Sequence, residues 1–317
     1  MKRHNEVVCM GLCSVDISVM GVDFDVFFQQ EATKPLHTRL CVGGDAINQS
    51  MTLSRLGHKV AFMGNVGNDD AGKCIQKVLT DQGVDLESLK IREDCITATV
   101  VVMVGENDER HMCPSTDASS NRKFDIDNVD FGAFAGVKAV SFCSLFCFPN
   151  INDDKLTEIF RKARASGAVT FADNKLNKNC SFDSFKTAMG YLDYLFINQD
   201  EAEFYSGMKT PEGAAKYFMD LGVQHVIVKL GSKGCYITDV TQSHYLSTFD
   251  VKLVDSVGAG DNFAAGFISS VLRGKSFYES AVFATATAGM TVASLGSSTG
   301  VKNMEQVQEF LRTNKLK

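Results

Sequence analysis

The middle of the chain alternates short apolar runs with helical patterns, and this alternation restricts the fold more than any other feature of the sequence. The apolar runs lie at 139–142, 169–172, 194–197 and 226–230, and each has the length of a buried strand. Between them, apolar residues recur at helical spacing over 153–165, 182–189 and 211–221. Strands that alternate with helices form parallel βαβ units, so we predict an α/β fold with a mostly parallel sheet and helices on both faces.

The two ends of the chain extend this pattern. We predict strands at 7–12 and 60–63, and helices at 44–56, 71–82, 259–272, 277–293 and 304–313. Alternating apolar residues predict a further strand over 22–28, and the β-branched run 97–104 forms a predicted hairpin with 110–113. These last segments do not join the alternation. We therefore expect a small separate sheet within a single domain, residues 1–317.

Composition excludes several classes of function. The 317 residues carry a net charge of −6, whereas binding to nucleic acid or to an anionic membrane surface requires a clustered positive field. The sequence shows no run of about 18 apolar residues and no signal segment, so we expect a cytoplasmic protein. The ten cysteines do not share metal-ligand spacing with histidines, and we interpret them as small core residues in a reducing compartment.

The segment from Gly67 to Lys73 has the spacing of a phosphate-binding P-loop, but its chemistry does not fit one. Cys74 stands where a P-loop needs a Ser or Thr hydroxyl for magnesium. Asp69 and Asp70 would also repel a triphosphate. We therefore predict an ordinary N-capped turn at the start of a helix.

A better candidate for anion binding lies at the start of the predicted helix 259–272. Around Gly258, Ala259 and Gly260, several unpaired N–H groups can converge with the positive end of the helix dipole. Asp261 follows directly, and a carboxylate beside an anion hole is what phosphoryl transfer to a hydroxyl requires of a protein. The alternative is that Asp261 only offsets the helix dipole, and these residues alone leave both interpretations open.

Several motifs, taken in order, resemble one known family. The segments Cys41-Val-Gly-Gly-Asp-Ala-Ile-Asn48 and Asp255-Ser-Val-Gly-Ala-Gly-Asp-Asn-Phe263 are similar to the two signature segments of the ribokinase-like (PfkB) carbohydrate kinases, and most similar to a bacterial sugar-kinase branch. Further similarity at 64–72, 82–85, 198–201 and 229–234 extends the resemblance over essentially the whole chain. It implies a ribokinase-like α/β fold with a small β-lid, and ATP-dependent phosphorylation of a sugar hydroxyl, expected to be a primary alcohol.

The resemblance implies roles for the residues around Asp261. Asp261 matches the catalytic base that takes the proton from the acceptor hydroxyl. The amides of Gly258, Ala259 and Gly260 match the anion hole for the transferring phosphoryl group. Asp255, together with the loop 296–300, resembles a monovalent-cation site, which suggests K⁺ as an additional cofactor.

On the nucleotide side, the resemblance implies ATP and Mg²⁺ as cofactors. Lys229, Gly231 and Gly234 match the strand and turn that lie along the nucleotide. Asn198 and Glu201 match the Asn-x-x-Glu motif, which organises magnesium and its waters near the phosphates. The alternative for Glu201 is an ordinary solvated helix residue.

On the acceptor side, the resemblance points to four residues that hydrogen-bond sugar hydroxyls: Asp16, Gly43, Gly44 and Asn48. Asn48 has the alternative of capping its helix or packing within it. Asp45 departs from the family pattern, because some members have lysine or alanine at this position. The sugar itself is therefore left open.

Two discontinuous segments, about 14–40 and 95–115, match the lid that covers the substrate and in many relatives forms the dimer contact. The resemblance thus implies a homodimer and a small-molecule sugar as partners. Arg110 is similar to a lid element of fructokinase-like members, and the alternative is a surface charge on a hairpin.

Two other functions remain open. A nucleoside kinase of the same fold would need aromatic side chains for the base, supplied by Phe24, Phe27, Phe146 or Phe148, although packing in a core or lid interface explains these residues more simply. A non-catalytic sugar or nucleotide sensor would be expected to lose Asp261 or the anion hole, and the sequence retains both.

Overall fold

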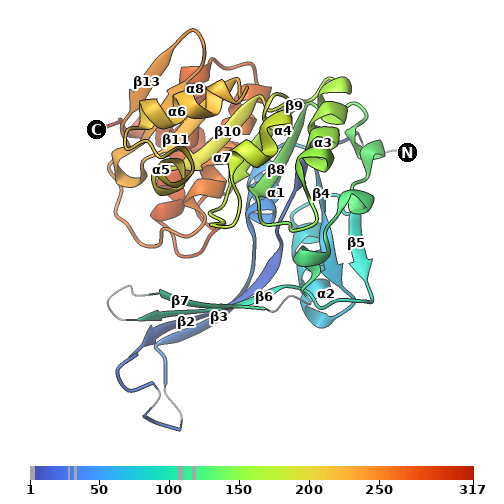
Figure 1. Ribbon diagram of the computed structural model, residues 1–317. Coiled ribbons are helices and arrows are strands. Elements are labelled where there is room, and N and C mark those ends of the chain that lie inside the picture. Colours follow the sequence, from blue (N-terminus) through green and yellow to red (C-terminus); the bar gives the residue numbers. More distant parts are fainter. Residues whose placement is uncertain (1–3, 28, 32–33, 106–109, 116–118) are drawn as a thin grey trace.

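The computed structural model describes residues 4–27, 29–31, 34–105, 110–115 and 119–317, and in this part of the chain a nine-stranded sheet forms the centre of the molecule (Figure 1). In spatial order its strands are β13 (Ser243–Leu246), β12 (Cys235–Thr238), β11 (His225–Lys229), β10 (Tyr194–Asn198), β9 (Val169–Asn174), β8 (Ala139–Leu145), β1 (Val7–Met10), β4 (Val60–Gly67) and β5 (Leu89–Arg92). Only β12 pairs antiparallel, with β11 and β13. The predicted, mostly parallel sheet is therefore confirmed.

Helices cover both faces of this sheet, as expected for buried parallel strands. One face packs against α3 (Asp153–Ala165), α4 (Lys186–Met189), α5 (Gln199–Ser206) and α6 (Pro211–Asp220). The other face packs against α1 (Asp45–Arg55), α2 (Asp70–Asp81), α7 (Ala259–Leu272) and α8 (Phe277–Val292). A last helix, α9 (Met304–Thr313), lies outside α8. Within the predicted helix 182–189, a 3₁₀ turn at Phe182–Phe185 precedes α4.

Local sequence explains where individual helices begin. In α3 the buried residues Leu156, Ile159, Phe160 and Ala163 recur at helical spacing and face the core. In α2 the N-cap is Asp69, whose carboxylate accepts a 2.8 Å hydrogen bond from the Gly72 amide. The P-loop-like segment is thus the N-capped turn that the sequence predicts.

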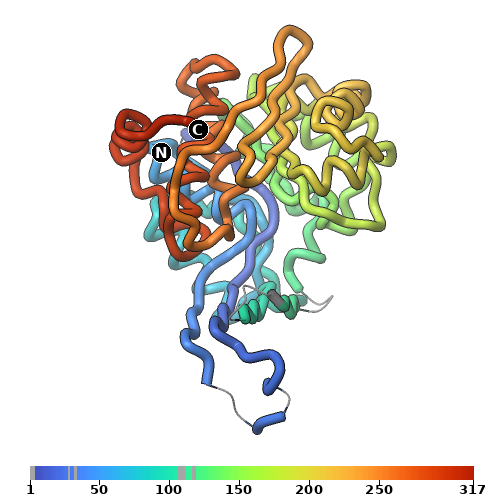
Figure 2. Tube along the Cα trace, turned by 90° about the vertical axis from the view of Figure 1, so that its left-hand side faces the viewer, coloured from blue at the N-terminus to red at the C-terminus, as the bar shows by residue number. Residues whose placement is uncertain are grey.

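A second sheet projects from the body of the molecule (Figures 1 and 2). Its described strands run in the order β3 (His37–Gly43), β2 (Ser14–Val22), β6 (Thr99–Gly105) and β7 (Arg110–Pro114). β6 and β7 pair antiparallel, which confirms the predicted hairpin and the separate small sheet.

The strand predicted over 22–28 is wrong. β2 lies earlier in the chain and ends at Val22, and residues 24–27 form turns. The Asp23 carboxylate accepts a 3.0 Å hydrogen bond from the Asp25 amide, and the Gln29 amide donates to the Val26 carbonyl at 2.9 Å. Such local bonds compete with a strand ladder, so the apolar alternation does not decide the structure here. Phe28 lies outside the described residues.

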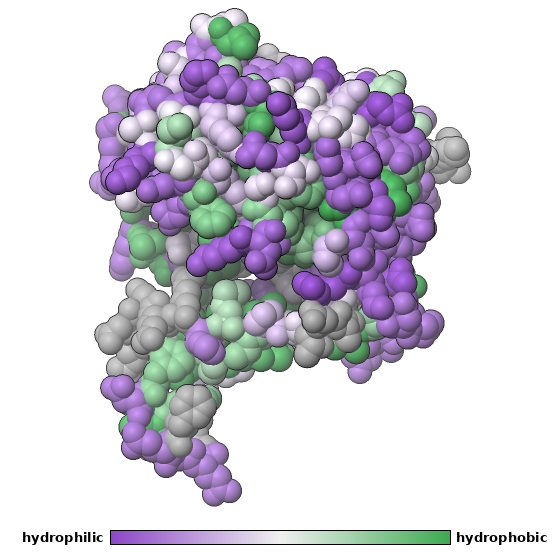
Figure 3. All heavy atoms as spheres, in the orientation of Figure 1, coloured by the Kyte–Doolittle hydropathy of each residue, from purple (hydrophilic) through white to green (hydrophobic). Residues whose placement is uncertain are grey.

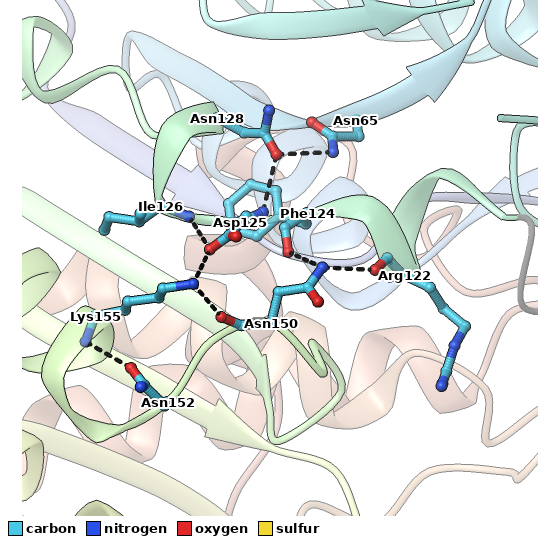
Figure 4. A network of polar contacts seen from close by, with 9 residues as sticks. All are labelled: Asn65, Arg122, Phe124, Asp125, Ile126, Asn128, Asn150, Asn152 and Lys155. Carbon is cyan, nitrogen blue, oxygen red and sulfur yellow. Dashed lines mark hydrogen bonds and ion pairs between the residues drawn. The ribbon is translucent and has the colours of Figure 1, made fainter. Parts of the chain in front are cut away.

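A polar network joins the segment that follows the small sheet to α3 (Figure 4). Lys155 Nζ donates to Asp125 Oδ1 at 2.6 Å and to the Asn150 carbonyl at 2.9 Å. Asn150 Nδ2 in turn donates to the Arg122 carbonyl at 3.0 Å. These contacts hold the 3₁₀ turns at Ser120–Lys123 and Ile126–Asn128 against the body of the fold.

All ten cysteines are free, and four of them, Cys9, Cys13, Cys143 and Cys235, are buried. The interpretation as core residues holds for these four, whereas Cys113 is exposed and the rest are half-buried. Among the described helices, none is long and apolar enough to span a membrane.

Candidate active site

The candidate site lies at the edge of the large sheet where its parallel strands end, which is where ligands bind in open α/β sheets. β9, β10 and β11 bring Asp173, Asn198 and Lys229 to this edge. The helices α1 and α7 pack against each other and bring Asn48 and Asp261 to the same region. Segments far apart in sequence therefore form one site.

Asp261 lies in the first turn of α7, and its carboxylate is tied to α1. Asn48 Nδ2 donates a 2.6 Å hydrogen bond to Asp261 Oδ2. The pKa of Asp261 is raised to about 7, first by burial and then by the carboxylates of Asp45 and Asp173, while Asn48 and Lys229 oppose the shift. A carboxyl group with this pKa can accept a proton near neutral pH.

The chain enters α7 through Gly258, which has a positive φ of 77°. The first helical hydrogen bond runs from the Asn262 amide to the Gly258 carbonyl at 2.9 Å, so the amides of Ala259, Gly260 and Asp261 precede the helical ladder. Ala259 makes a long 3.4 Å bond back to the Ser256 carbonyl. The start of α7 thus presents amides and the positive end of a helix dipole, as an anion site requires.

Lys229 adds a positive charge beside this helix start. A Cβ placed on Gly260 would lie 3.2 Å from Lys229 Nζ. Lys229 also forms a 2.7 Å ion pair with Asp173, and the two side chains are 16% and 5% exposed. Burial raises the pKa of Asp173 to about 6, against the effect of Lys229. For Lys229, burial favours the neutral form, but Asp173 together with Glu201 and Asp261 outweighs burial, and the pKa is raised.

A cavity of about 420 Å³ opens beside the start of α7. Ala259 and Gly260 lie on its wall together with three of the residues expected to contact the nucleotide, Lys229, Gly231 and Gly234. The remaining wall is mainly apolar and includes Phe249, Val251, Leu253, Phe263 and Val292. An apolar cavity of this size with an anion site on its wall fits a base and its phosphates.

Asn198 and Glu201 form a reciprocal cap at the start of α5. Asn198 Oδ1 accepts from the Glu201 amide at 2.9 Å, and Glu201 Oε2 accepts from the Asn198 amide at 3.2 Å. Glu201 Oε1 also accepts from the Leu176 amide at 3.1 Å. Glu201 is buried, so the interpretation as a solvated helix residue is wrong, and burial raises its pKa.

The oxygens of Asn198 and Glu201 suit Mg²⁺, which prefers oxygen ligands and usually keeps several waters. Within the described ranges, no group of three or more His, Cys, Asp or Glu side chains is arranged to hold a metal ion directly. The residues present therefore fit a magnesium ion bound through water and phosphate oxygens.

Two residues expected to contact the acceptor, Asp16 on β2 and Gly43 on β3, lie close together, although Gly43 pairs with Ser14 in the ladder. Ser14 Oγ donates to Asp16 Oδ1 at 2.7 Å, and burial raises the pKa of Asp16. A Cβ on Gly43 would overlap the Asp16 carboxylate, so only glycine permits this approach. Gly44 is the N-cap of α1 and adjoins Asp45.

The structure describes the surroundings of two further predicted residues, Asn48 and Asp255, but not those of the Arg110 side chain. The amide of Asn48 is engaged by protein groups, because its Oδ1 also accepts from Ser297 Oγ at 3.1 Å. Asp255 accepts from the Val257 and Gly296 amides, both at 3.0 Å, and so joins two loops. Arg110 begins β7, and its side chain lies outside the described part of the structure.

Sequence patterns alone did not single out Asp173 or Lys175, which lie at and directly after the end of β9. Their position at the carboxyl end of a predicted parallel strand could have indicated them, because ligands bind at such strand ends.

Comparison with known proteins agrees with this geometry. The model of the pfkB family carbohydrate kinases matches residues 4–304. Ribokinase of Haemophilus influenzae is 25% identical over 292 residues, which cover 88% of this chain and 92% of that protein. The 2-dehydro-3-deoxygluconokinase of Bacillus subtilis is 27% identical over 280 residues, 85% of this chain and 86% of that protein.

Solved structures show the same fold. A ribokinase-like protein of Escherichia coli, solved with ATP and Mg²⁺, superposes with a TM-score of 0.82 at 21% identity, over 97% of this chain and 99% of that one. The chain belongs to the pfkB family of carbohydrate kinases. The predicted ribokinase-like fold and the predicted enzyme class, a phosphotransferase, are thereby confirmed.

Proposed function

We propose that this protein transfers the γ-phosphoryl group of ATP to a hydroxyl of a sugar, expected to be a primary alcohol, with Asp261 as the general base. The observation that carries the proposal is the position of Asp261. Its buried carboxylate, with a pKa raised to about 7, lies at the start of α7, where amides and Lys229 form a positive site next to an apolar cavity.

In the proposed reaction, the acceptor hydroxyl gives its proton to Asp261 as its oxygen bonds to the γ-phosphorus. The bond between the γ-phosphorus and the bridging oxygen of ATP breaks, and ADP leaves. Because Asp261 Oδ2 is held by Asn48, Oδ1 is the oxygen that takes the proton. The amides of Gly258, Ala259 and Gly260, with Lys229, stabilise the charge on the transferring group.

ATP and Mg²⁺ fit the remaining residues. Gly231, Gly234 and the cavity wall would hold the nucleoside part of ATP, and Asn198 and Glu201 would hold magnesium through water. Bound magnesium would neutralise charge on the phosphate oxygens. Asp16, Gly43, Gly44 and Asn48 would form the acceptor site, and the family resemblance implies Arg110 as a further acceptor contact. A K⁺ ion near Asp255 is a further part of the proposal, supported by the contact of Asp255 with the loop 296–300, which the resemblance implies as part of a monovalent-cation site.

The small sheet is proposed to be the lid and the contact surface of a homodimer. On the face drawn in Figure 3, a recess separates this sheet from the body of the molecule, and hydrophobic side chains gather on the sheet. Leu40 on β3 and Met112 on β7 are 60% and 57% exposed. Contact of these side chains with a second copy of the chain would remove this apolar surface from water. Closure of the small sheet over the acceptor would exclude water from the reaction.

The test is ADP release with Mg²⁺ and ATP across hexoses, pentoses, sugar acids and nucleosides. Release that depends on a sugar supports the proposal. Selectivity for a nucleoside would show that the acceptor is a nucleoside rather than a sugar. Phe146 and Phe148 are 7% and 3% exposed, so these two rings are unsuited to stack on the base of a nucleoside. No release with any acceptor would instead support a non-catalytic sensor.

A further inference from the structure

Ser297 lies in the loop after α8, where it contacts side chains of both helices that form the site of the candidate base. Its Oγ donates a 3.1 Å hydrogen bond to Asn48 Oδ1 on α1. Its carbonyl accepts a 2.7 Å hydrogen bond from Asn262 Nδ2 on α7. One residue thereby joins the side chain that holds Asp261 to the helix that carries Asp261.

The position of Ser297 is fixed from two sides. Asn262 is fully buried, and its Nδ2 also donates to the Gly258 carbonyl at 2.7 Å. The Oδ1 of Asn262 accepts from Thr52 Oγ1 on α1 at 2.6 Å. A Cβ on Gly258 would overlap the Ser297 carbonyl oxygen, so the two backbones approach closely. This packing holds the backbone of Ser297, and with it the hydroxyl, next to Asn48.

Two donors in line point toward the Asp261 carboxylate. The Ser297 hydroxyl donates to the amide oxygen of Asn48, and the amide nitrogen donates to Asp261 Oδ2 at 2.6 Å. Linked hydrogen bonds polarise one another, and a bond that ends on an ionised group is about twice as strong as a neutral one. The chain of bonds therefore stabilises ionised Asp261 more than protonated Asp261. Asn48 is buried, so loss of the Ser297 donor would remove a hydrogen bond from a buried amide oxygen.

Charged groups from several elements also act on Asp261. Asp45 on α1 and Asp173 on β9 raise its pKa, and Lys229 on β11 lowers it. Lys175, directly after β9, is itself affected by Asp261. A substitution of the serine changes none of these charges, nor that of any other group in the protein. Its effect on the base would therefore pass through the chain of hydrogen bonds.

We propose that Ser297 is a positioning residue for the general base, because it orients and polarises the Asn48 amide and so keeps Asp261 ionised and ready to accept the proton. This inference rests on the proposed kinase function and deepens it. The resemblance places Ser297 only within the loop 296–300 and gives its hydroxyl no role.

The test is the pH dependence of kcat/KM for the acceptor, measured by ADP release at one KCl concentration in S297A and the wild-type protein. The acidic limb of S297A should move to higher pH by about 0.5–1 unit, since the ionised form of Asp261 loses more than the protonated form. At about pH 6, kcat/KM should therefore fall by about three- to tenfold, whereas at about pH 9 it should stay within about twofold of the wild-type value. The same ATP and Mg²⁺ are present in both assays, so their own titration cancels in the comparison.

Three further variants make the test specific. S297C fills the same space with a weaker donor, so its limb should lie between those of S297A and the wild-type protein. The double variant N48A/S297A should have the limb of N48A alone, because Ser297 acts through Asn48. The matched control is S294A, whose hydroxyl donates to the Met290 carbonyl at 3.1 Å, and it should have the wild-type profile. Thermal unfolding establishes that each variant folds.

The outcomes separate this inference from the kinase function. Three results with folded variants overturn the inference and leave the kinase function standing: an S297A profile that superimposes on the wild-type profile, an equal loss of kcat/KM at every pH, or a further shift of the limb in the double variant. No ADP release by the wild-type protein contradicts the kinase function itself, and a flat wild-type profile removes Asp261 as the base. The inference falls with either of these last two results.

Discussion

Asn48 holds Asp261 through a 2.6 Å hydrogen bond from Nδ2 of Asn48 to Oδ2 of Asp261. Ser297 Oγ donates to the other end of the same amide at 3.1 Å, so the amide nitrogen is the atom that faces Asp261. The two residues lie near the starts of α1 and α7, which pack against each other. One carboxylate oxygen is thereby fixed, and the other is left for an acceptor hydroxyl.

Replacing Asp261 by asparagine should remove the base without changing the shape of the site. We expect D261N to lower kcat by about 10²–10⁴-fold, the usual contribution of a general base, while ATP still binds. Turnover is measured by ADP release, and ATP affinity by calorimetry. The matched control is D154N, an exposed aspartate in the first turn of α3, which should leave both quantities unchanged. Near-normal turnover of D261N would remove Asp261 from the mechanism.

The activity should depend on pH through Asp261. Its pKa is raised to about 7, mainly by burial, and the base must be deprotonated to act. Hence kcat/KM should fall about tenfold per pH unit below this pKa and level off above it. N48A removes a hydrogen bond that lowers this pKa, so the acidic limb should move to higher pH. A profile that is flat from about pH 5 to 8 would contradict the role of Asp261.

Two glycines at the start of α7 should respond differently to alanine. At Gly258, φ is +77° and a Cβ would overlap the Ser297 carbonyl, so G258A should lower the free energy of unfolding by about 1–3 kcal/mol. At Gly260, the nearest group is the flexible end of Lys229 at 3.2 Å. G260A should therefore fold nearly normally but lose activity, because its methyl group enters the anion site. Urea unfolding and ADP release separate the two effects, and full activity of G260A would exclude this anion site.

The proposed role of Glu201 in magnesium binding can be tested separately from its role in the helix cap. E201Q removes the negative charge and keeps one oxygen, which can accept from one of the two backbone amides that Glu201 engages. We expect the Mg²⁺ concentration that gives half-maximal activity to rise, with activity recovering at saturating Mg²⁺, and the unfolding temperature to fall because one backbone amide loses its acceptor. N303A, which removes the N-cap of the distant α9, is a control that should leave the magnesium titration unchanged. If E201Q and the wild-type protein gave the same magnesium titration curve, Glu201 would have no role in magnesium binding and would serve only the helix cap.

The sequence by itself determined the succession of β8 to β11 and the helices between them, because local apolar periodicity decides such elements. It did not predict β3, β5, β12 or β13 as strands, and it misplaced β2, because short strands and local aspartate turns depend on partners that periodicity does not show.

For the site, the sequence singled out Asp261 and the glycines before it, because the motif carries its chemistry in adjacent residues. Only the tertiary structure brought Asn48, Asp45 and Asp173 around Asp261 and buried its carboxylate. Burial and charge raise the pKa of Asp261, and both come from segments that meet only when the chain folds.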